Sequence, residues 1–382
     1  MQPILLMKTN YPDCQCSVEP AAQLSSHKLD ATGTKPVRLF GRFRILSTLL
    51  AGAMAAGLLS AATPARAFET GGDMSELTWE QNSMGIKFKD ANGSAIDPIA
   101  YAKAQHWTCI RLRLLVDGGS GVLGQNLNYI IPLAQRAKSN GLHVILDLFY
   151  SNGWCDPNEQ YPPSEWSGYN YSQMCTAVYG WTQWALTQFK NANCLPDYVQ
   201  VGNEINNGML WPIGSLSNQS QLVGLITSGI KGVRSVSSSP KIILHCANGA
   251  NTSTVTWFFN TIASKCSYDI VGLSYYPAQG TTLSDIQSAM NTYNGAFGGR
   301  PIMIVEFAYW YSGGHTSGSG YWTTPTGQQQ CTYNLVQIMK SYSHGAGVMY
   351  WGTTYVTGSW GSESLFDYST DKAEPAWGAL WQ

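Results

Sequence analysis

Strand-like and helix-like segments alternate along the chain, and this alternation is the feature that most limits its possible folds. Short apolar runs rich in β-branched residues predict strands at 72–75, 109–116, 143–149, 198–203, 242–246, 270–275, 302–307 and 347–351. Segments with apolar residues at helical spacing predict helices at 127–139, 173–191, 221–235, 283–293 and 328–343. Because each parallel strand is reached through a crossover that is usually a helix, the alternation predicts a parallel sheet. Eight strands in one uninterrupted span predict an α/β protein with a single (β/α)₈ barrel.

A doubly wound sheet is the alternative arrangement of the same elements. Its dinucleotide-binding form carries a GxGxxG motif after the first strand, and the sequence after residue 75 has no such motif. No linker or low-complexity tract interrupts the alternation, and no further module follows the last predicted strand. We therefore expect residues 68–382 to form one barrel.

The N-terminal segment has the order of features found in a secretory signal peptide. Basic residues lie between positions 35 and 44, an apolar run extends from 45 to 62, and Ala65-Arg66-Ala67 forms a small-x-small cleavage site. We expect residues 35–67 to be this signal. A transmembrane anchor is the alternative, because the apolar run approaches the length of a membrane span. Residues 1–34 match neither a signal nor a domain, and one hypothesis is that translation begins after them.

A cleaved signal predicts a secreted or periplasmic protein of a bacterium, with no membrane attachment after cleavage. The charge balance excludes a nucleic-acid partner: Lys+Arg is 22 and Asp+Glu is 23, for a net charge of −1, whereas nucleic-acid binding needs a basic surface. The 14 Trp and 21 Tyr favour a carbohydrate ligand, because a flat ring matches the apolar face of a sugar. Core packing is the alternative role for most of these rings. We expect a monomer.

Seven cysteines follow the signal segment, and their spacing predicts no metal centre. No CxxC pair or Cys/His cluster is present, so we predict no cofactor. The odd number leaves at least one thiol free, and the pairing of the others stays open. Two of them lie inside predicted strands and are expected to be buried thiols. The seven are Cys109, Cys155, Cys175, Cys194, Cys246, Cys266 and Cys331, of which Cys109 and Cys246 are the strand residues.

Two glutamates stand at the carboxyl ends of predicted strands. The fourth predicted strand runs into Glu204, and four apolar residues of the seventh precede Glu306. Chemistry in (β/α)₈ barrels lies at this end of the strands, where a carboxylate is costly unless it is paired or functional. For either residue alone, a structural ion pair is the alternative. Together they predict the carboxyl pair of glycoside hydrolysis, in which one group protonates the leaving oxygen and the other attacks the anomeric carbon or activates water.

The segment around Glu204 also carries a resemblance. Residues 196–212, PDYVQVGNEINNGMLWP, resemble the strand-four signature of glycoside hydrolase family 53, the endo-β-1,4-galactanases. Similar pieces occur in the same order at 110–113 (IRLR), 147–151 (DLFYS), 272–277 (GLSYYP) and 305–309 (VEFAY), together with Trp154 and Asp156-Pro157. The resemblance implies a retaining (β/α)₈ glycosidase that cuts pectic arabinogalactan. It also implies Glu204 as general acid/base and Glu306 as nucleophile.

Several further residues are expected to support these two. A guanidinium would hold Glu306 ionised, and either Arg113 or Arg111 on the second strand is expected to supply it. Tyr276 is expected to donate a hydrogen bond to Glu306. Asn203 is expected to bind the sugar 2-hydroxyl. The predicted substrate-binding residues are therefore Arg113, Asn203 and Tyr276, with Asp147 from the strand-three segment, Trp351 as a stacking platform at the end of the last strand, and Trp154 in a neighbouring loop.

The sequence departs from the family where the sugar is expected to bind. The family usually has His where Phe149 stands, Asp at Asn152, Thr at Phe307 and a Glu at Gly352. Because a polar group that binds a hydroxyl cannot be exchanged for an apolar one, these changes leave the substrate open. The alternatives are another β-glycan, such as β-mannan, and a non-catalytic carbohydrate-binding barrel. The sequence gives no support for a calcium site, because residues 315–319 are rich in Gly and Ser and lack acids, and calcium binding stays open.

Overall fold

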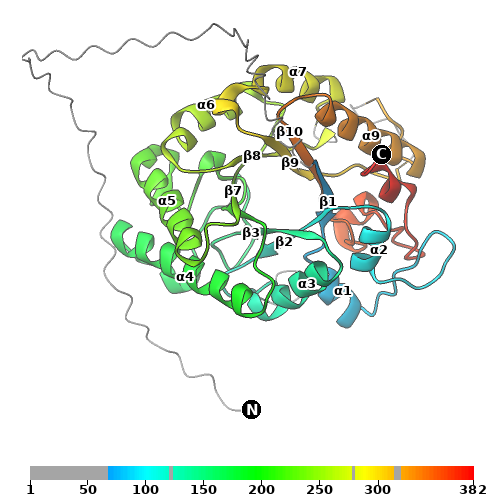
Figure 1. The fold of residues 1–382 in the computed structure, drawn as a ribbon, viewed down its shortest axis with the longest axis horizontal. Coiled ribbons are helices and arrows are strands. Elements are labelled where there is room, and N and C mark those ends of the chain that lie inside the picture. The colour runs from blue at the N-terminus through cyan, green and yellow to red at the C-terminus, as the bar shows by residue number, and fades with distance from the viewer. Residues whose placement is uncertain (1–67, 120–123, 278–279, 314–319) are drawn as a thin grey trace, which may run out of the picture. The chain divides into compact units, whose positions relative to one another are not determined.

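The computed structural model describes residues 68–119, 124–277, 280–313 and 320–382. The predicted signal at 35–67, the preceding residues 1–34 and the Gly/Ser-rich segment at 315–319 lie outside the described residues. Within the described part, parallel strands close into a barrel in the order β1-β10-β9-β8-β7-β4-β3-β2, which confirms the predicted (β/α)₈ fold (Figure 1). The barrel strands are β1 (Glu69–Asp73), β2 (Cys109–Leu114), β3 (His143–Leu148), β4 (Tyr198–Val201), β7 (Lys241–Cys246), β8 (Ile270–Ser274), β9 (Ile302–Phe307) and β10 (Gly345–Tyr350).

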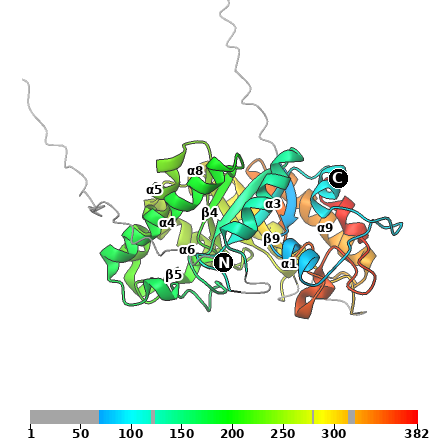
Figure 2. The ribbon, with the colours of Figure 1, turned by 90° about the horizontal axis from the view of Figure 1, so that it is seen from below.

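Helices surround this barrel, as the view along its axis in Figure 1 and the view from below in Figure 2 show. They are α1 (Leu77–Asn82), α2 (Pro98–Ala104), α3 (Leu127–Ser139), α4 (Tyr171–Asn191), α5 (Gln219–Val236), α6 (Thr252–Thr261), α7 (Leu283–Tyr293), the short α8 (Ala296–Gly299) and α9 (Pro325–Lys340). Two short strands, β5 (Gly208–Met209) and β6 (Gly214–Ser215), form an antiparallel pair after β4. Among the described residues, no helix is long and apolar enough to span a membrane.

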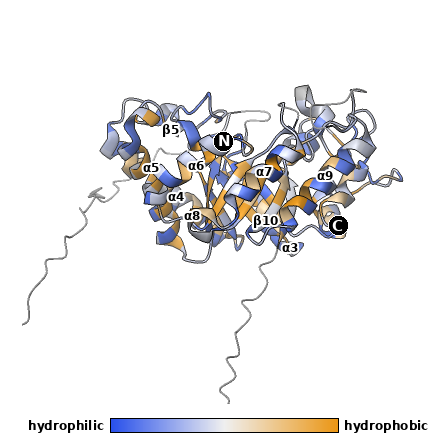
Figure 3. Cartoon of the chain, turned by 90° about the horizontal axis from the view of Figure 1, so that it is seen from above, coloured by the Kyte–Doolittle hydropathy of each residue, from blue (hydrophilic) through white to orange (hydrophobic). Residues whose placement is uncertain are grey.

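Alternate residues of each strand face two different environments. On β2, Ile110, Leu112 and Leu114 belong to the large core between strands and helices, whereas Cys109 belongs to a separate cluster inside the barrel. Figure 3 shows the strands as the hydrophobic centre, with polar residues on the outer helices. This period of two is the expected result of a pleated strand that is covered on both faces.

The barrel interior changes from apolar to polar toward the carboxyl ends of the strands. Cys109, Ile145 and Ile243 belong to the interior cluster, and Tyr198 packs against it. On each of these four strands, the residue two positions later is polar. These later residues, Arg111, Asp147, Gln200 and His245, are all fully buried and hydrogen-bond to one another in turn around the barrel. The interior is therefore apolar in the layer toward the amino ends of the strands and polar in the layer toward their carboxyl ends.

Two differences from the predicted elements have physical causes. The first strand begins at Glu69, three residues before the predicted start, because this polar residue is buried at the barrel's lower end and accepts hydrogen bonds from Tyr198 and Thr108. Helix α6 was not predicted, because its sequence, TSTVTWFFNT, is rich in β-branched and aromatic residues. The side chain of Asn251 caps its N-terminus and accepts a hydrogen bond from the Thr254 amide.

Candidate active site

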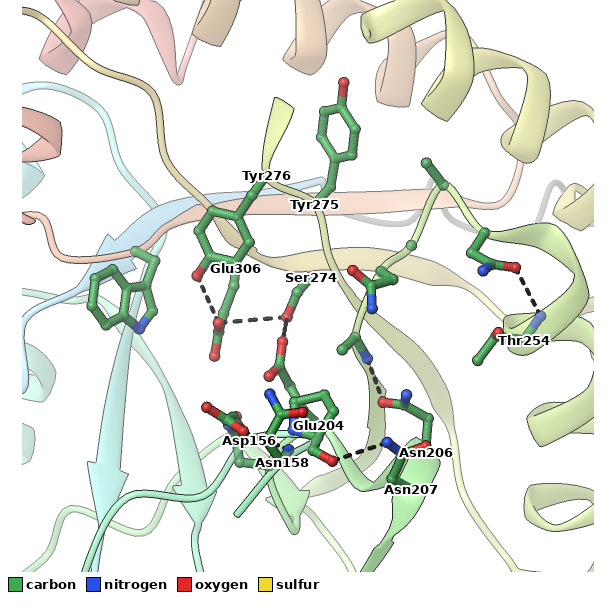
Figure 4. Close-up of a pocket in the computed structure, with 18 of the residues that line it drawn as sticks. Asp156, Asn158, Glu204, Asn206, Asn207, Thr254, Ser274, Tyr275, Tyr276 and Glu306 are labelled. Carbon is green, nitrogen blue, oxygen red and sulfur yellow. Dashed lines mark hydrogen bonds between the residues drawn. The ribbon is translucent and has the colours of Figure 1, made fainter. Parts of the chain in front are cut away.

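A cavity of about 610 Å³ opens at the carboxyl ends of the barrel strands. Its size falls in the range of small-molecule sites. The described residues that line it include both glutamates and four of the predicted substrate-binding residues: Glu204, Glu306, Asn203, Tyr276, Trp154 and Trp351. Figure 4 shows Glu204, Ser274, Glu306 and Tyr276 meeting in this cavity. The structure thus brings together residues that are distant in the sequence.

Glu204 is placed by a sharp turn after β4. Gly202 has a φ of 83°, and a Cβ atom there would lie 2.6 Å from Cγ2 of Ile205, so the position requires glycine. Glu204 itself adopts a left-handed conformation, with φ 48° and ψ 49°. This conformation is uncommon for a residue with a side chain, and such strain concentrates at functional sites. The turn directs Glu204 into the cavity instead of toward the helices.

A bulge in β9 places Glu306. The pairing with β8 shifts between Leu273 and Ser274, and β9 carries one extra residue at this point. Val305 belongs to the cluster inside the barrel, so a regular pleat would turn the next side chain outward. The bulge instead lets both consecutive side chains face inward, and Glu306 lines the cavity. The sequence placed Glu306 at a strand end but contained no sign of this irregularity.

Ser274, at the end of β8, connects the two glutamates. Its Oγ lies 2.5 Å from Oε1 of Glu204 and 3.4 Å from Oε2 of Glu306. The nearest oxygens of the two carboxyl groups are therefore no more than about 6 Å apart, which fits the roughly 5–5.5 Å between the carboxyl groups of retaining glycosidases better than the roughly 6.5–9.5 Å of inverting ones. In the sequence, Ser274 stands out only as part of the GLSYYP segment, and no role was predicted for it.

The environment of Glu204 favours its protonated form. Burial raises the pKa of Glu204 to about 8, and the negative charge of Glu306 adds to the rise. The Ser274 hydroxyl acts in the opposite direction, because it donates a hydrogen bond to the carboxylate. Glu204 is therefore suited to donate a proton near neutral pH.

Arg111 is the guanidinium beside Glu306. Its Nη2 lies 2.8 Å from Oε1 of Glu306 and 2.6 Å from Oδ2 of Asp147, and its Nη1 lies 2.9 Å from Oδ2 of Asp73. Burial alone would lower the pKa of Arg111, but these carboxylates raise it above its usual value. Nη2 also donates to Oδ1 of Asn203 at 3.0 Å. One fixed cation thus orients four oxygen-bearing side chains.

Arg113 and Asp147 lie behind the cavity wall. Both side chains are fully buried, and neither lines the cavity. Arg113 forms an ion pair with Glu76, and its guanidinium lies 5.0 Å from the ring centre of Trp154 and 5.5 Å from that of Trp351. These distances are within the range of cation–π contacts. Arg113 thus contacts two aromatic wall residues, while Asp147 contacts Arg111 and Gln200.

Aromatic rings form one wall of the cavity. The hydroxyl of Tyr276 donates a 2.7 Å hydrogen bond to Oε2 of Glu306, as the sequence led us to expect. Trp360 lines the same wall, with its ring centre 4.5 Å from that of Trp351 and 5.8 Å from that of Tyr276. Trp360 was not predicted, because it lies in a short 3₁₀ helix after β10 (Gly358–Glu363), where no strand or motif marks it.

Phe149 and Gly352, two of the positions that depart from the family, lie close to this wall. Phe149 lines the cavity, and its ring packs edge-on against Trp154 at 5.7 Å. Gly352 has a φ of 64°, a conformation that a glutamate would adopt only with strain. The cavity is therefore apolar at Phe149, at a position where the sequence was seen to depart from the family.

The described residues contain no group of three or more His, Cys, Asp or Glu side chains that could hold a metal ion. All seven cysteines in the described residues are free and buried. This confirms the expectation of buried thiols at Cys109 and Cys246, and it answers the pairing question that the sequence left open.

Comparisons with known proteins agree with the geometry. The model of Glycosyl hydrolase family 53 matches residues 69–378. A probable arabinogalactan endo-β-1,4-galactanase A from Neosartorya fischeri is 30% identical, over 79% of this chain and 90% of that protein. The family 53 catalytic domain from Ignisphaera aggregans has a TM-score of 0.76 at 30% identity, over 82% of this chain and 95% of that one. A fungal β-1,4-galactanase structure has a TM-score of 0.76 at 27% identity, over 82% of this chain and 99% of that one.

The family match covers the whole described barrel from β1 onward, including both strand-end glutamates and the residues that join them. The protein is therefore a glycoside hydrolase that belongs to glycosyl hydrolase family 53.

Proposed function

We propose that this enzyme hydrolyses internal β-1,4-galactosidic bonds of galactan and arabinogalactan, with retention of configuration at the anomeric carbon. The observation that carries the mechanism is the single serine hydroxyl that reaches both glutamates, because it holds the two carboxyl groups closer to the separation of retaining glycosidases than to that of inverting ones. The names of the family 53 relatives support the choice of substrate.

In the first step, Glu306 attacks the anomeric carbon while Glu204 donates its proton to the departing glycosidic oxygen. Arg111 and Tyr276, which contact Glu306, orient its carboxyl group for this attack. In the second step, Glu204 accepts a proton from water, which attacks the glycosyl–enzyme ester and releases Glu306. The charge of Glu306 disappears in the ester, so the pKa of Glu204 falls at the stage where it must act as a base.

The aromatic wall supplies the sugar-binding surface in this proposal. The rings of Trp351, Trp360 and Trp154 line the cavity beside the glutamates, and their faces can pack on the apolar face of a sugar ring. Asn203 retains one amide hydrogen for the sugar 2-hydroxyl, because among the described residues its Nδ2 donates only one hydrogen bond, to the carbonyl of Cys155. Carboxyl groups and water suffice for this chemistry, so we propose no cofactor.

We also propose that the enzyme is exported and acts as a monomer. The family match and the first strand both begin at Glu69, which is consistent with cleavage after Ala67.

The test measures sugar release from linear β-1,4-galactan by the parent enzyme, Glu204→Ala and Glu306→Ala. We expect both variants to lose at least about a thousandfold in kcat, whereas Glu165→Gln, which changes an exposed carboxyl outside the cavity, should match the parent. Azide then separates the two roles. It attacks the substrate directly when Glu306 is missing, and it attacks the glycosyl–enzyme without a general base when Glu204 is missing. Glu204→Ala should yield a β-galactosyl azide and Glu306→Ala an α-galactosyl azide. The same azide anomer from both variants would contradict the assignment.

One observation favours a second substrate class. The apolar side chain of Phe149 at the cavity wall leaves no partner for a hydroxyl group that a histidine would bind. A family member with another β-glycan specificity, such as a β-mannanase, would fit this change. Parallel assays on galactan, mannan and glucan distinguish the two proposals, and Phe149→His should raise the galactan-to-mannan activity ratio by about tenfold if Phe149 sets specificity.

A further inference from the structure

Ser274 occupies a position from which it can interact with both glutamates. Its side chain is buried, and its hydroxyl is within hydrogen-bond distance of Glu204 and Glu306. A third group, Nε2 of His245, lies 2.7 Å from the same oxygen. A hydroxyl group has only one hydrogen to donate, so its role depends on which of these three partners receives it.

The surroundings of His245 decide this question. Burial and the nearby charge of Arg111 lower the pKa of His245 well below its usual value, so the ring is neutral and carries one N–H. The backbone N–H of Glu204 points at Nδ1 from 3.3 Å, and Nε2 of Gln200 lies 2.9 Å from Nδ1. A backbone N–H can only donate, so Nδ1 is an acceptor. Asn203 Oδ1, which lies 3.0 Å from Nδ1, takes its hydrogen bond from Arg111 instead.

The ring hydrogen therefore resides on Nε2 and is donated to Ser274 Oγ. With its oxygen occupied by this donor, Ser274 directs its own hydrogen away from the histidine and toward the two carboxyl groups. His245 thus fixes the direction of the serine hydroxyl without exchanging a proton with it.

We propose that Ser274 is a positioning residue whose hydroxyl hydrogen follows the negative charge between Glu306 and Glu204 during the reaction. This inference rests on the proposed retaining mechanism. Before attack, Glu306 carries the charge. When Glu306 forms its bond to the anomeric carbon, the bond to the leaving oxygen breaks and the proton of Glu204 passes to that oxygen, so the charge now resides on Glu204. Hydrolysis by water reverses the transfer.

One hydroxyl within reach of both groups stabilises whichever carboxylate is ionised, and hydrogen bonds to charged acceptors are the stronger kind. The shorter contact, 2.5 Å to Glu204 against 3.4 Å to Glu306, indicates that the larger effect falls on the glycosyl–enzyme stage, in which Glu204 is the anion. Loss of the hydroxyl should therefore raise the pKa of Glu204 more in the glycosyl enzyme than in the free enzyme.

The experiment compares the parent with Ser274→Ala, Ser274→Thr and Ser228→Ala. Ser228 is a buried serine on α5 whose hydroxyl bonds to the Gly224 carbonyl, outside the cavity, so its variant controls for the loss of a buried hydroxyl. Each protein is labelled with ¹³C at its glutamate carboxyls. Glu204 is then titrated by NMR in the free enzyme and after trapping with 2,4-dinitrophenyl 2-deoxy-2-fluoro-β-galactoside. The other groups acting on Glu204, namely Glu306, Asp156 and Arg111, are unchanged in every variant.

We expect Ser274→Ala to raise the pKa of Glu204 in the trapped enzyme by about one unit and to lower kcat on galactan by about tenfold to a hundredfold. Ser274→Thr, which keeps a hydroxyl group, should stay close to the parent in the pKa of Glu204 and in kcat. Ser228→Ala should match the parent in both quantities. If Ser274→Ala fails to fold, Ser274→Cys supplies the comparison, because it keeps a side chain of similar size with a weaker donor. An unchanged pKa in the trapped enzyme would overturn the proposal.

Trapping also separates this inference from the proposed function. A mass increase equal to one fluorosugar on the peptide that contains Glu306 supports the retaining mechanism independently of Ser274. If trapping succeeds and the pKa of Glu204 does not respond to Ser274→Ala, the Ser274 proposal alone is wrong. If neither fluorogalactosides nor fluoromannosides label the parent enzyme, the retaining mechanism and the role of Ser274 are both rejected.

Discussion

Arg111 and Glu306 form an ion pair inside the barrel, with Nη2 of the arginine 2.8 Å from Oε1 of the glutamate, although they lie on β2 and β9. The same guanidinium contacts Asp73 and Asp147. A planar fork with several fixed N–H groups can serve these partners together, whereas a lysine ammonium is a single point of charge. The nucleophile position therefore depends on the shape of Arg111 as well as on its charge.

Arg111→Lys should lower kcat by at least about tenfold and reduce the free energy of unfolding by about 3 kcal/mol, since buried carboxylates lose partners. Steady-state kinetics and thermal unfolding measure the two effects. Arg136→Lys is the matched control, because Arg136 pairs with Asp97 at 2.8 Å on the exposed surface. If Arg111→Lys behaves like this control, the proposed role of the guanidinium fork is wrong.

The pH profile should report the protonation of Glu204. Because burial and Glu306 raise its pKa to about 8, the acid form predominates below that pH and is lost above it. On galactan, kcat/KM should therefore fall as the pH rises through about 8. A 2,4-dinitrophenyl β-galactoside, whose leaving group needs no proton, should lack this decline. The same decline with both substrates would show that another group controls the alkaline limb.

Arg113 should affect substrate binding through the tryptophans that it contacts. Arg113→Met removes the cation beneath Trp154 and Trp351 and should raise KM by about fivefold with a smaller change in kcat. It also leaves Glu76 unpaired in the interior, which should lower stability. The double variant Arg113→Met/Glu76→Gln should regain stability without regaining KM. If the double variant recovers the parent's KM as well as its stability, the KM effect of Arg113→Met came from misfolding.

Gly202 should be needed for the placement of Glu204. In Gly202→Ala, the new methyl group would lie 2.6 Å from Ile205 at a φ of 83°, so the turn must shift. Gly85→Ala provides the control, because its φ is 71° but no atom lies within 4 Å. Both variants should lose about 1 kcal/mol of stability from backbone strain, and only Gly202→Ala should lose activity. Circular dichroism melting measures the stability of each variant, and galactan assays measure its activity. A fully active Gly202→Ala enzyme would contradict the proposed need for glycine at this turn.

Much of this architecture was predictable from local sequence patterns. The hydrophobic runs of the central strands and the 127–139 helix were predicted at or near their observed bounds, because burial on both faces gives continuous apolar sequence. The positions of Glu204 and Glu306 followed from the rule that strand ends face the mouth of the barrel. The hydrogen bond from Tyr276 to Glu306 was also anticipated.

What escaped prediction depends on contacts between distant segments. The bulge that turns Glu306 inward is visible only in the pairing of β8, β9 and β10. The pleat of β2 puts both Arg111 and Arg113 inside the barrel. Which of them pairs with Glu306 depends on their height along the barrel axis relative to the carboxylate, and the sequence does not give this height. Ser274 and His245 gave no signal, because a single serine or histidine in a strand is ordinary until its neighbours are known.

The seven buried thiols have a consequence for how this enzyme can be made and kept. Burial raises the pKa of the Cys155 thiol to about 12, and thiolates are the reactive form, so these cysteines resist oxidation. The described residues of the barrel hold together without a disulfide. Folding therefore needs no oxidant and no isomerase to correct mispaired bridges. The enzyme should fold equally well in a reducing cytoplasm and keep its activity in strong reductants that inactivate disulfide-stabilised hydrolases.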